Sequence, residues 1–156
     1  MDKKIKKYCG FGMFLMSIIL ASHAFSQSLI APDADYTPQE VIEIQLLGLQ
    51  SGDPDQGIHQ VWVFAHPYNK RATGPLARFK TLFDMPAYAP LLDLRSYSIE
   101  QVSKTAIESQ FVVSIVTNNG FTYDYLWAVE KVLDGDQAGF WMTTKVSSPR
   151  KLSRAS

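Results

Sequence analysis

The sequence predicts an α+β fold, with three N-terminal helices followed by a mainly antiparallel sheet of about four strands. Apolar residues recur at helical spacing in the first half, between Pro38 and Pro86. From Ser96 to Val146 the apolar period changes to two, the spacing of strands with one buried face. Because the helices precede the strands instead of alternating with them, we expect the helices to cover one face of the sheet.

The first 24 residues are predicted to be a signal peptide. Four lysines precede the apolar run 11–21, and two small-x-small cleavage patterns follow, Ser22-His23-Ala24 and Ala24-Phe25-Ser26. The run is shorter than the roughly 20 residues that a membrane span needs. We therefore expect export, to the periplasm or outside the cell, with no membrane contact after cleavage. Anchoring through an uncleaved leader is the alternative.

Charge and cysteine content restrict the partners of the exported part. The full chain has 15 basic and 15 acidic residues, and the leader removes four lysines and one aspartate, which leaves a net charge of −3. This mild acidity is atypical of a nucleic-acid-binding surface. Cys9, the only cysteine, lies in the leader, so no disulfide is expected. The partner is expected to be a small molecule or a protein, including a second copy in a homodimer.

Capping and breaking residues predict the bounds of the helices. Residues 25–36 are expected to be an extended lead-in, and a single domain then spans 37–147. Thr37 and Glu40 form a capping-box pattern for the first helix. A second helix is predicted from about Gln56 to His66, where the following proline disfavours helical geometry. Gly74-Pro75 is expected to open a third helix, which ends before Pro86.

Alternation and turn residues predict four strands. They cover 96–102, a segment from Phe111 to the turn Asn118-Asn119-Gly120, the segment 121–130, and 140–146. Asn-Gly indicates a tight hairpin, because both central residues tolerate positive φ. The tail 148–156 has little to bury and is expected to be disordered.

Three segments resemble a known family: PQEVIEIQLLGLQ, VWVFAHPYNKRATGPLARF and GFWMTTKV. They are similar to domain-of-unknown-function family 4864, a member of the nuclear-transport-factor-2-like superfamily, and the resemblance extends from about Pro38 to Val146. It implies a cone of three helices on a curved mixed or antiparallel sheet, often dimeric through the sheet. It implies no reaction, because the superfamily includes enzymes, ligand carriers and interaction domains.

The segment 64–79 contains the first group of candidate site residues, His66, Asn69, Lys70 and Arg71. One interpretation is a connection between two helices, in which His66 lies at a helix C-terminus that favours an imidazolium and Asn69 forms an Asx-turn. The functional interpretation is an anion-binding site with Lys70 and Arg71 beside the amides that open the third helix. Contact with a partner is a third possibility.

The second group of candidates is Asp124 with Tyr97 and Tyr125. A carboxylate and a tyrosine facing a pocket can perform proton abstraction, as in ketosteroid isomerase of the superfamily that this chain resembles. Strand alternation, however, places Asp124 and Tyr125 on opposite faces of the sheet. The aromatic residues Tyr123, Tyr125, Trp127 and Trp141 are interpreted either as core or as the lining of a pocket.

No metal or cofactor is predicted. His59 and His66 are two helical turns apart and cannot hold one metal ion. The two acidic turns that begin at Asp53 and Asp134 lack the glutamate that ends an EF-hand loop. We therefore favour a non-enzymatic ligand-binding or protein-interaction module. A small lyase or isomerase is the rival, and a dimeric structural protein without ligand is the third hypothesis.

Overall fold

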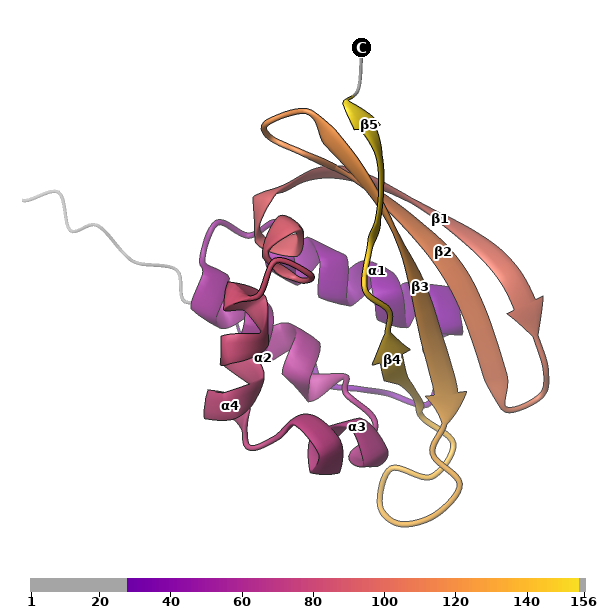
Figure 1. Cartoon of the computed structure of the whole chain (residues 1–156). Coiled ribbons are helices and arrows are strands. Elements are labelled where there is room, and N and C mark those ends of the chain that lie inside the picture. Colours follow the sequence, from indigo (N-terminus) through magenta and orange to yellow (C-terminus); the bar gives the residue numbers. More distant parts are fainter. Residues whose placement is uncertain (1–27, 155–156) are drawn as a thin grey trace, which may run out of the picture.

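The computed structural model describes residues 28–154, which form an α+β domain with the helices on one side of a curved, unclosed sheet (Figure 1). The predicted signal peptide 1–24 and the start of the lead-in lie outside the described residues. None of the helices formed by residues 28–154 has the length and apolarity that a membrane crossing requires.

The first two helices pack closely against each other. Helix α1 (Pro38–Leu49) begins with the predicted capping box: the Glu40 amide donates to Thr37 Oγ1 at 3.2 Å, and the Thr37 amide donates to the Glu40 carboxylate at 2.7 Å. Helix α2 (Pro54–Val63) is capped by Asp53. Its first residue, Pro54, lies two positions before the predicted start at about Gln56. The helices cross through Gly48 and Gly57, where a Cβ on Gly57 would lie 2.7 Å from the Gly48 carbonyl oxygen.

A helix that was not predicted follows the second one. The segment interpreted as a connection forms α3 (Pro67–Thr73), and then α4 (Leu76–Thr81) leads into the short 3-10 helices Leu82–Asp84 and Ala89–Asp93. The expectation of three helices was therefore wrong. No residue of α3 is buried, so the helix has no apolar periodicity from which it could be predicted.

Within residues 28–154 the sheet has five antiparallel strands. Four of them follow one another in the order β1 (Leu94–Lys104), β2 (Glu108–Thr117), β3 (Phe121–Lys131) and β4 (Trp141–Val146), and the fifth also pairs with β3. The hairpin between β2 and β3 confirms the Asn-Gly prediction, but only Gly120 has a positive φ, 83°. Strand β2 ends at Thr117 and β3 begins at Phe121, so three residues connect them, one more than in a two-residue turn.

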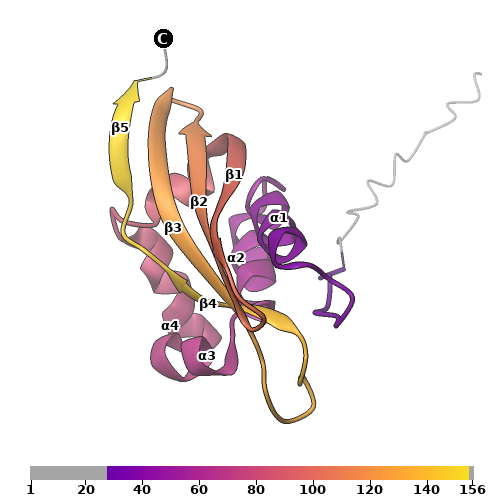
Figure 2. The same cartoon turned by 90° about the vertical axis from the view of Figure 1, so that its right-hand side faces the viewer.

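The fifth strand lies in the tail for which disorder was expected. Strand β5 (Arg150–Arg154) pairs with the first residues of β3, beyond the end of β4, as Figures 1 and 2 show. Lys151 Nζ lies 3.7 Å from the centre of the Phe121 ring and Arg150 reaches Asp124 at 3.0 Å. The partner strand β3 lies far from β5 in the sequence, so the composition of the tail alone did not indicate these contacts.

The core lies between the helices and the inner face of the sheet. Alternate residues of β2 and β3 face the helices and are buried, namely Phe111, Val113, Ile115, Tyr125, Trp127 and Val129. They join Val41, Ile42, Leu46 and Phe64 from the helical half in one apolar cluster. The core interpretation of the aromatic row thus holds for Tyr125, whereas Trp127 is buried in the core and also lines a cavity.

Candidate functional site

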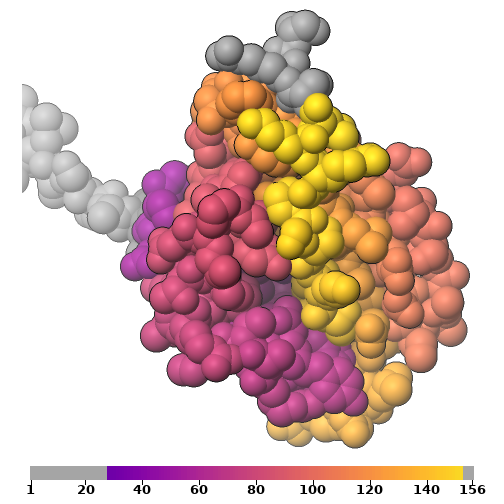
Figure 3. All heavy atoms as spheres, in the orientation of Figure 1, coloured from indigo at the N-terminus to yellow at the C-terminus, as the bar shows by residue number. Residues whose placement is uncertain are grey.

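A cavity of about 460 Å³ lies between the helices and the strands β3 and β4. Figure 3 shows the surface hollowed between the magenta helical segments and the yellow C-terminal segment. Apolar side chains from both the helices and the sheet line the cavity, among them Leu49, Val61, Phe79, Phe83, Leu91 and Trp127. Its volume falls in the range of about 300–1,000 Å³ that is typical of small-molecule sites.

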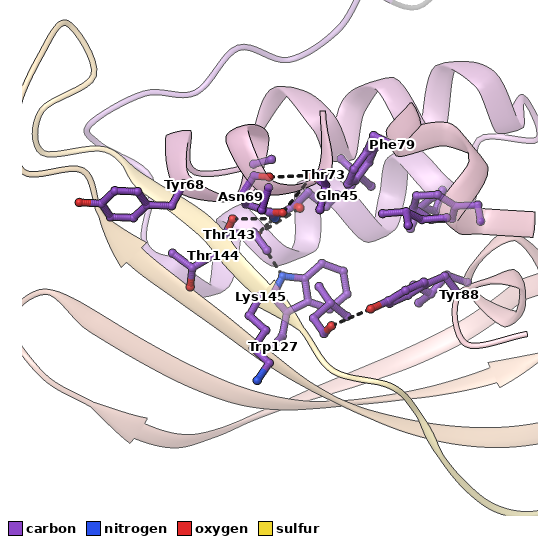
Figure 4. A pocket seen from close by; sticks show the side chains of 18 residues that line it. Gln45, Tyr68, Asn69, Thr73, Phe79, Tyr88, Trp127, Thr143, Thr144 and Lys145 are labelled. Carbon is purple, nitrogen blue, oxygen red and sulfur yellow. Dashed lines mark hydrogen bonds between the residues drawn. The ribbon is translucent and has the colours of Figure 1, made fainter. Parts of the chain in front are cut away.

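A hydrogen-bonded cluster forms part of the cavity wall. Thr143 Oγ1 accepts from Trp127 Nε1 at 3.0 Å and from Gln45 Nε2 at 2.9 Å (Figure 4). The same Gln45 nitrogen donates to the Val41 carbonyl at 2.8 Å, and the Thr143 hydroxyl is 3.2 Å from Gln45 Oε1. All three side chains are buried, so their polar atoms satisfy one another without water.

Asn69 and Thr73 of helix α3 also line the cavity. Asn69 Nδ2 donates to the Thr143 carbonyl at 3.2 Å, which ties α3 to β4. Thr73 Oγ1 donates to the Asn69 carbonyl at 2.7 Å. Tyr88 closes another part of the lining, with its hydroxyl donating to the Val146 carbonyl at 3.1 Å. The wall thus combines an apolar surface with a few polar groups that already have partners.

The lining has almost no charge. Among the described residues that line the cavity there is no Asp, Glu or His, and Lys145 is the one charged residue. Lys145 pairs with Ala128 on the sheet, and its side chain runs away from the helices (Figure 4). No charged side chain of this lining therefore points into the cavity.

The structure places His66 differently from the sequence interpretation. Helix α2 ends at Val63, the segment 64–66 pairs with β4, and His66 caps the N-terminus of α3, not a helix C-terminus. His66 Nδ1 accepts from the Tyr68 amide at 3.2 Å. Burial lowers the pKa of His66, and Arg71 and Lys70 lower it further against the opposing effect of Glu130. The expected imidazolium is therefore disfavoured, and the neutral ring serves as the cap.

The other residues of the first group have separate contacts. Asn69 lies on α3, where it docks to β4 instead of forming an Asx-turn. Lys70 Nζ donates to the Val63 carbonyl at 3.1 Å, and burial lowers the pKa of this lysine. Arg71 stacks on the ring of Tyr68 at 4.6 Å. Of the four candidates, only Asn69 lines the cavity.

The residues of the second group lie on opposite faces of the sheet. Asp124 lies on the face away from the helices, where it accepts from Ser114 Oγ at 2.7 Å and from Arg150 at 3.0 Å. Burial acts to raise the pKa of Asp124, but these two hydrogen bonds outweigh it and the pKa lies below its ordinary value. Asp124 is therefore an ionised, hydrogen-bonded carboxylate on the outer face of the sheet, with 13% of its side chain exposed.

The two tyrosines face the core. Tyr125 is fully buried and its hydroxyl donates to the Ala87 carbonyl at 3.0 Å, and burial raises its pKa. Tyr97 packs against the core cluster from β1, and burial followed by the charge of Glu43 raises its pKa. Asp124, Tyr97 and Tyr125 are all absent from the cavity lining, so the candidate carboxylate–tyrosine pair of the rival hypothesis is not assembled there.

Within the described part of the chain, no three His, Cys, Asp or Glu side chains gather as a potential metal site. Sequence reasoning missed Gln45, Thr143 and Tyr88 as cavity residues. One signal was available: Gln45 interrupts the apolar stripe formed by Val41 and Leu49 on α1, and a polar residue there needs a buried partner.

Comparison with known proteins finds no matching family model, no similar curated protein and no similar solved structure. The geometry of the cavity is therefore the basis for a functional proposal.

Proposed function

We propose that this protein is an exported, non-enzymatic module that binds a small molecule in the cavity between its helices and its sheet. The observation that carries the proposal is a mainly apolar cavity of about 460 Å³ whose lining directs no acid or base into it. Export is supported by the leader pattern in residues 1–24. The proposal includes a nuclear-transport-factor-2-like cone, which the helices covering one face of a curved sheet support.

The composition of the cavity favours binding over catalysis. Proton-transfer chemistry requires a titratable group within hydrogen-bond reach of the reacting atom. The carboxylate offered for that role, Asp124, lies on the other face of the sheet and is engaged by Ser114 and Arg150. Of the two lining tyrosines, Tyr88 already donates its hydroxyl hydrogen to a backbone carbonyl, and the hydroxyl of Tyr68 points away from the cavity (Figure 4). A lyase or isomerase of the ketosteroid-isomerase type would lack its base in this cavity.

Two measurements test the proposal. Native mass spectrometry of the protein, purified gently from its host, should show an extra mass that is released on denaturation, and it also reports whether the protein is a dimer. Titration with N-phenyl-1-naphthylamine, an uncharged fluorescent apolar probe, should give saturable binding at one site per chain.

A matched pair of variants locates the binding. Ala72 and Ala77 are both exposed helical alanines, on α3 and α4, but only Ala72 lines the cavity. Ala72→Trp narrows the cavity and should weaken probe binding at least tenfold, whereas Ala77→Trp should leave it unchanged. Equal binding by both variants, or a purified protein that neither carries a ligand nor binds the probe, would refute the proposed function.

A further inference from the structure

We propose that the ligand of this cavity is an uncharged, mainly apolar molecule that donates a hydrogen bond, such as a hydrophobic alcohol. This inference rests on the proposed function and specifies the class of its ligand. It follows from where the hydrogens of the lining polar groups are directed, which is a separate observation from the volume of the cavity.

The hydrogens of most lining donors are already used within the protein. Gln45 donates one amide hydrogen to the Val41 carbonyl and the other to the Thr143 hydroxyl. The Trp127 indole N–H also donates to the Thr143 hydroxyl. Hydroxyl groups have one hydrogen each. Thr73 directs its hydrogen to the Asn69 carbonyl, and Tyr88 directs its hydrogen to the Val146 carbonyl.

The same pattern continues at the edge of the lining. The Thr144 hydroxyl donates to the Ala128 carbonyl at 3.3 Å, and the hydroxyl of Tyr68 points away from the cavity in Figure 4. Asn69 Nδ2 uses one hydrogen on Thr143, which leaves its second amide hydrogen as a donor that no described residue accepts. The cavity therefore offers few donors to a ligand.

Acceptors remain, because a hydroxyl oxygen has two lone pairs in addition to its hydrogen. Thr73 and Tyr88 each donate their hydrogen to the backbone, and their oxygens keep the capacity to accept from a ligand. A ligand with an O–H or N–H group therefore matches this wall better than one that only accepts.

Charged ligands are disfavoured by the same geometry. A carboxylate needs several donors to replace its hydration, and the cost of burying it without them is several kcal/mol or more. The one charged side chain of the described lining, that of Lys145, runs away from the helices (Figure 4). An ammonium group would in turn find no carboxylate among the described lining residues. An uncharged polar group avoids both costs.

The test is a displacement series in which the apolar part stays constant. Bound N-phenyl-1-naphthylamine is displaced by 1-decanol, by decanoate, by decylammonium, and by 1-methoxynonane, an isomer of decanol that accepts but cannot donate. We expect decanol to displace the probe at a concentration at least tenfold below those of the two ions, and several-fold below that of the ether. Tyr88→Phe, which removes one acceptor, should reduce the preference for decanol over the ether.

The displacement series distinguishes a failure of the proposed ligand class from a failure of the proposed binding function. Decanoate or decylammonium binding as tightly as decanol would overturn the uncharged class, and the ether binding as tightly would overturn the donated hydrogen bond. In both cases the cavity would still be a binding site. If the probe itself does not bind, the proposed function fails together with the inference.

Discussion

Replacing Thr143 with valine tests the hydrogen-bonded cluster in the cavity wall. Valine has nearly the same shape as threonine but cannot accept or donate. In the native protein the Thr143 hydroxyl accepts from the indole of Trp127 at 3.0 Å and from the amide of Gln45 at 2.9 Å, and all three side chains are buried. The substitution therefore leaves a fully buried indole N–H without an acceptor.

The expected loss of stability can be worked out from these contacts. An orphaned buried donor costs about 1–3 kcal/mol. Gln45 keeps its bond to Val41, so the loss on that side chain is smaller, about 1 kcal/mol. Thr143→Val should therefore destabilise the protein by about 2–4 kcal/mol, a large share of the roughly 5–15 kcal/mol that is typical of a domain. The corresponding fall in Tm is on the order of 10 °C.

Urea unfolding followed by tryptophan fluorescence measures this difference. The control is Thr144→Val, because Thr144 also lines the cavity but is half-buried and makes one long hydrogen bond to Ala128. It should cost less than about 1 kcal/mol. If Thr143→Val unfolds at the same urea concentration as the native protein, or if Thr144→Val is equally destabilised, the cluster does not stabilise the fold as inferred.

Three further predictions follow from the cap on α3, the fifth strand and the outer face of the sheet. Because the pKa of His66 is lowered in the folded state, the unfolded state takes up the proton first, so the free energy of unfolding should decrease as the pH falls below about 6.5. In urea unfolding at pH 8 and pH 5.5, His66→Asn should weaken this dependence and His59→Asn should keep it; an unchanged dependence in His66→Asn would contradict the assignment. Deleting residues 150–156 should speed amide hydrogen exchange in the stretch of β3 that pairs with β5, residues 121–124, and not in the stretch that pairs with β4, residues 127–131; uniform exchange along β3 would argue against a paired β5. Asp124→Asn should cost on the order of 1 kcal/mol in urea unfolding, because Arg150 is 76% exposed and asparagine keeps an oxygen that can accept from Ser114, although the Asp124 side chain is only 13% exposed. It should leave binding of the apolar probe unchanged; loss of binding would mean that this carboxylate acts on the cavity.

Sequence reasoning succeeded where the signal is local. The capping box at Thr37 and Glu40 formed as predicted, because its partners are three residues apart. The two-residue period of β2 and β3 correctly separated the buried residues from the outer ones, including Tyr125 from Asp124. These features depend on neighbouring residues alone, so they can be read before the tertiary structure is known.

Sequence reasoning failed where the stabilising partner is distant. Helix α3 has no buried residue, and it is held by the His66 cap and by the contact of Asn69 with Thr143, 74 positions along the chain. Strand β5 exists because β3 extends beyond the end of β4 and leaves an edge to pair with. Composition and periodicity carry no information about either partner.

The sequence by itself determined that the helices precede the sheet, where the first helix starts and which residues of the central strands face inward, since short-range sterics and hydrogen bonds decide these features. Only the tertiary structure decided that a cavity exists, that most of its polar hydrogens are used internally, and that Asp124 lies outside it. The lining comes from segments as far apart as Gln45 and Thr143. Such a site is a property of how the helices pack on the sheet, and no local pattern encodes it.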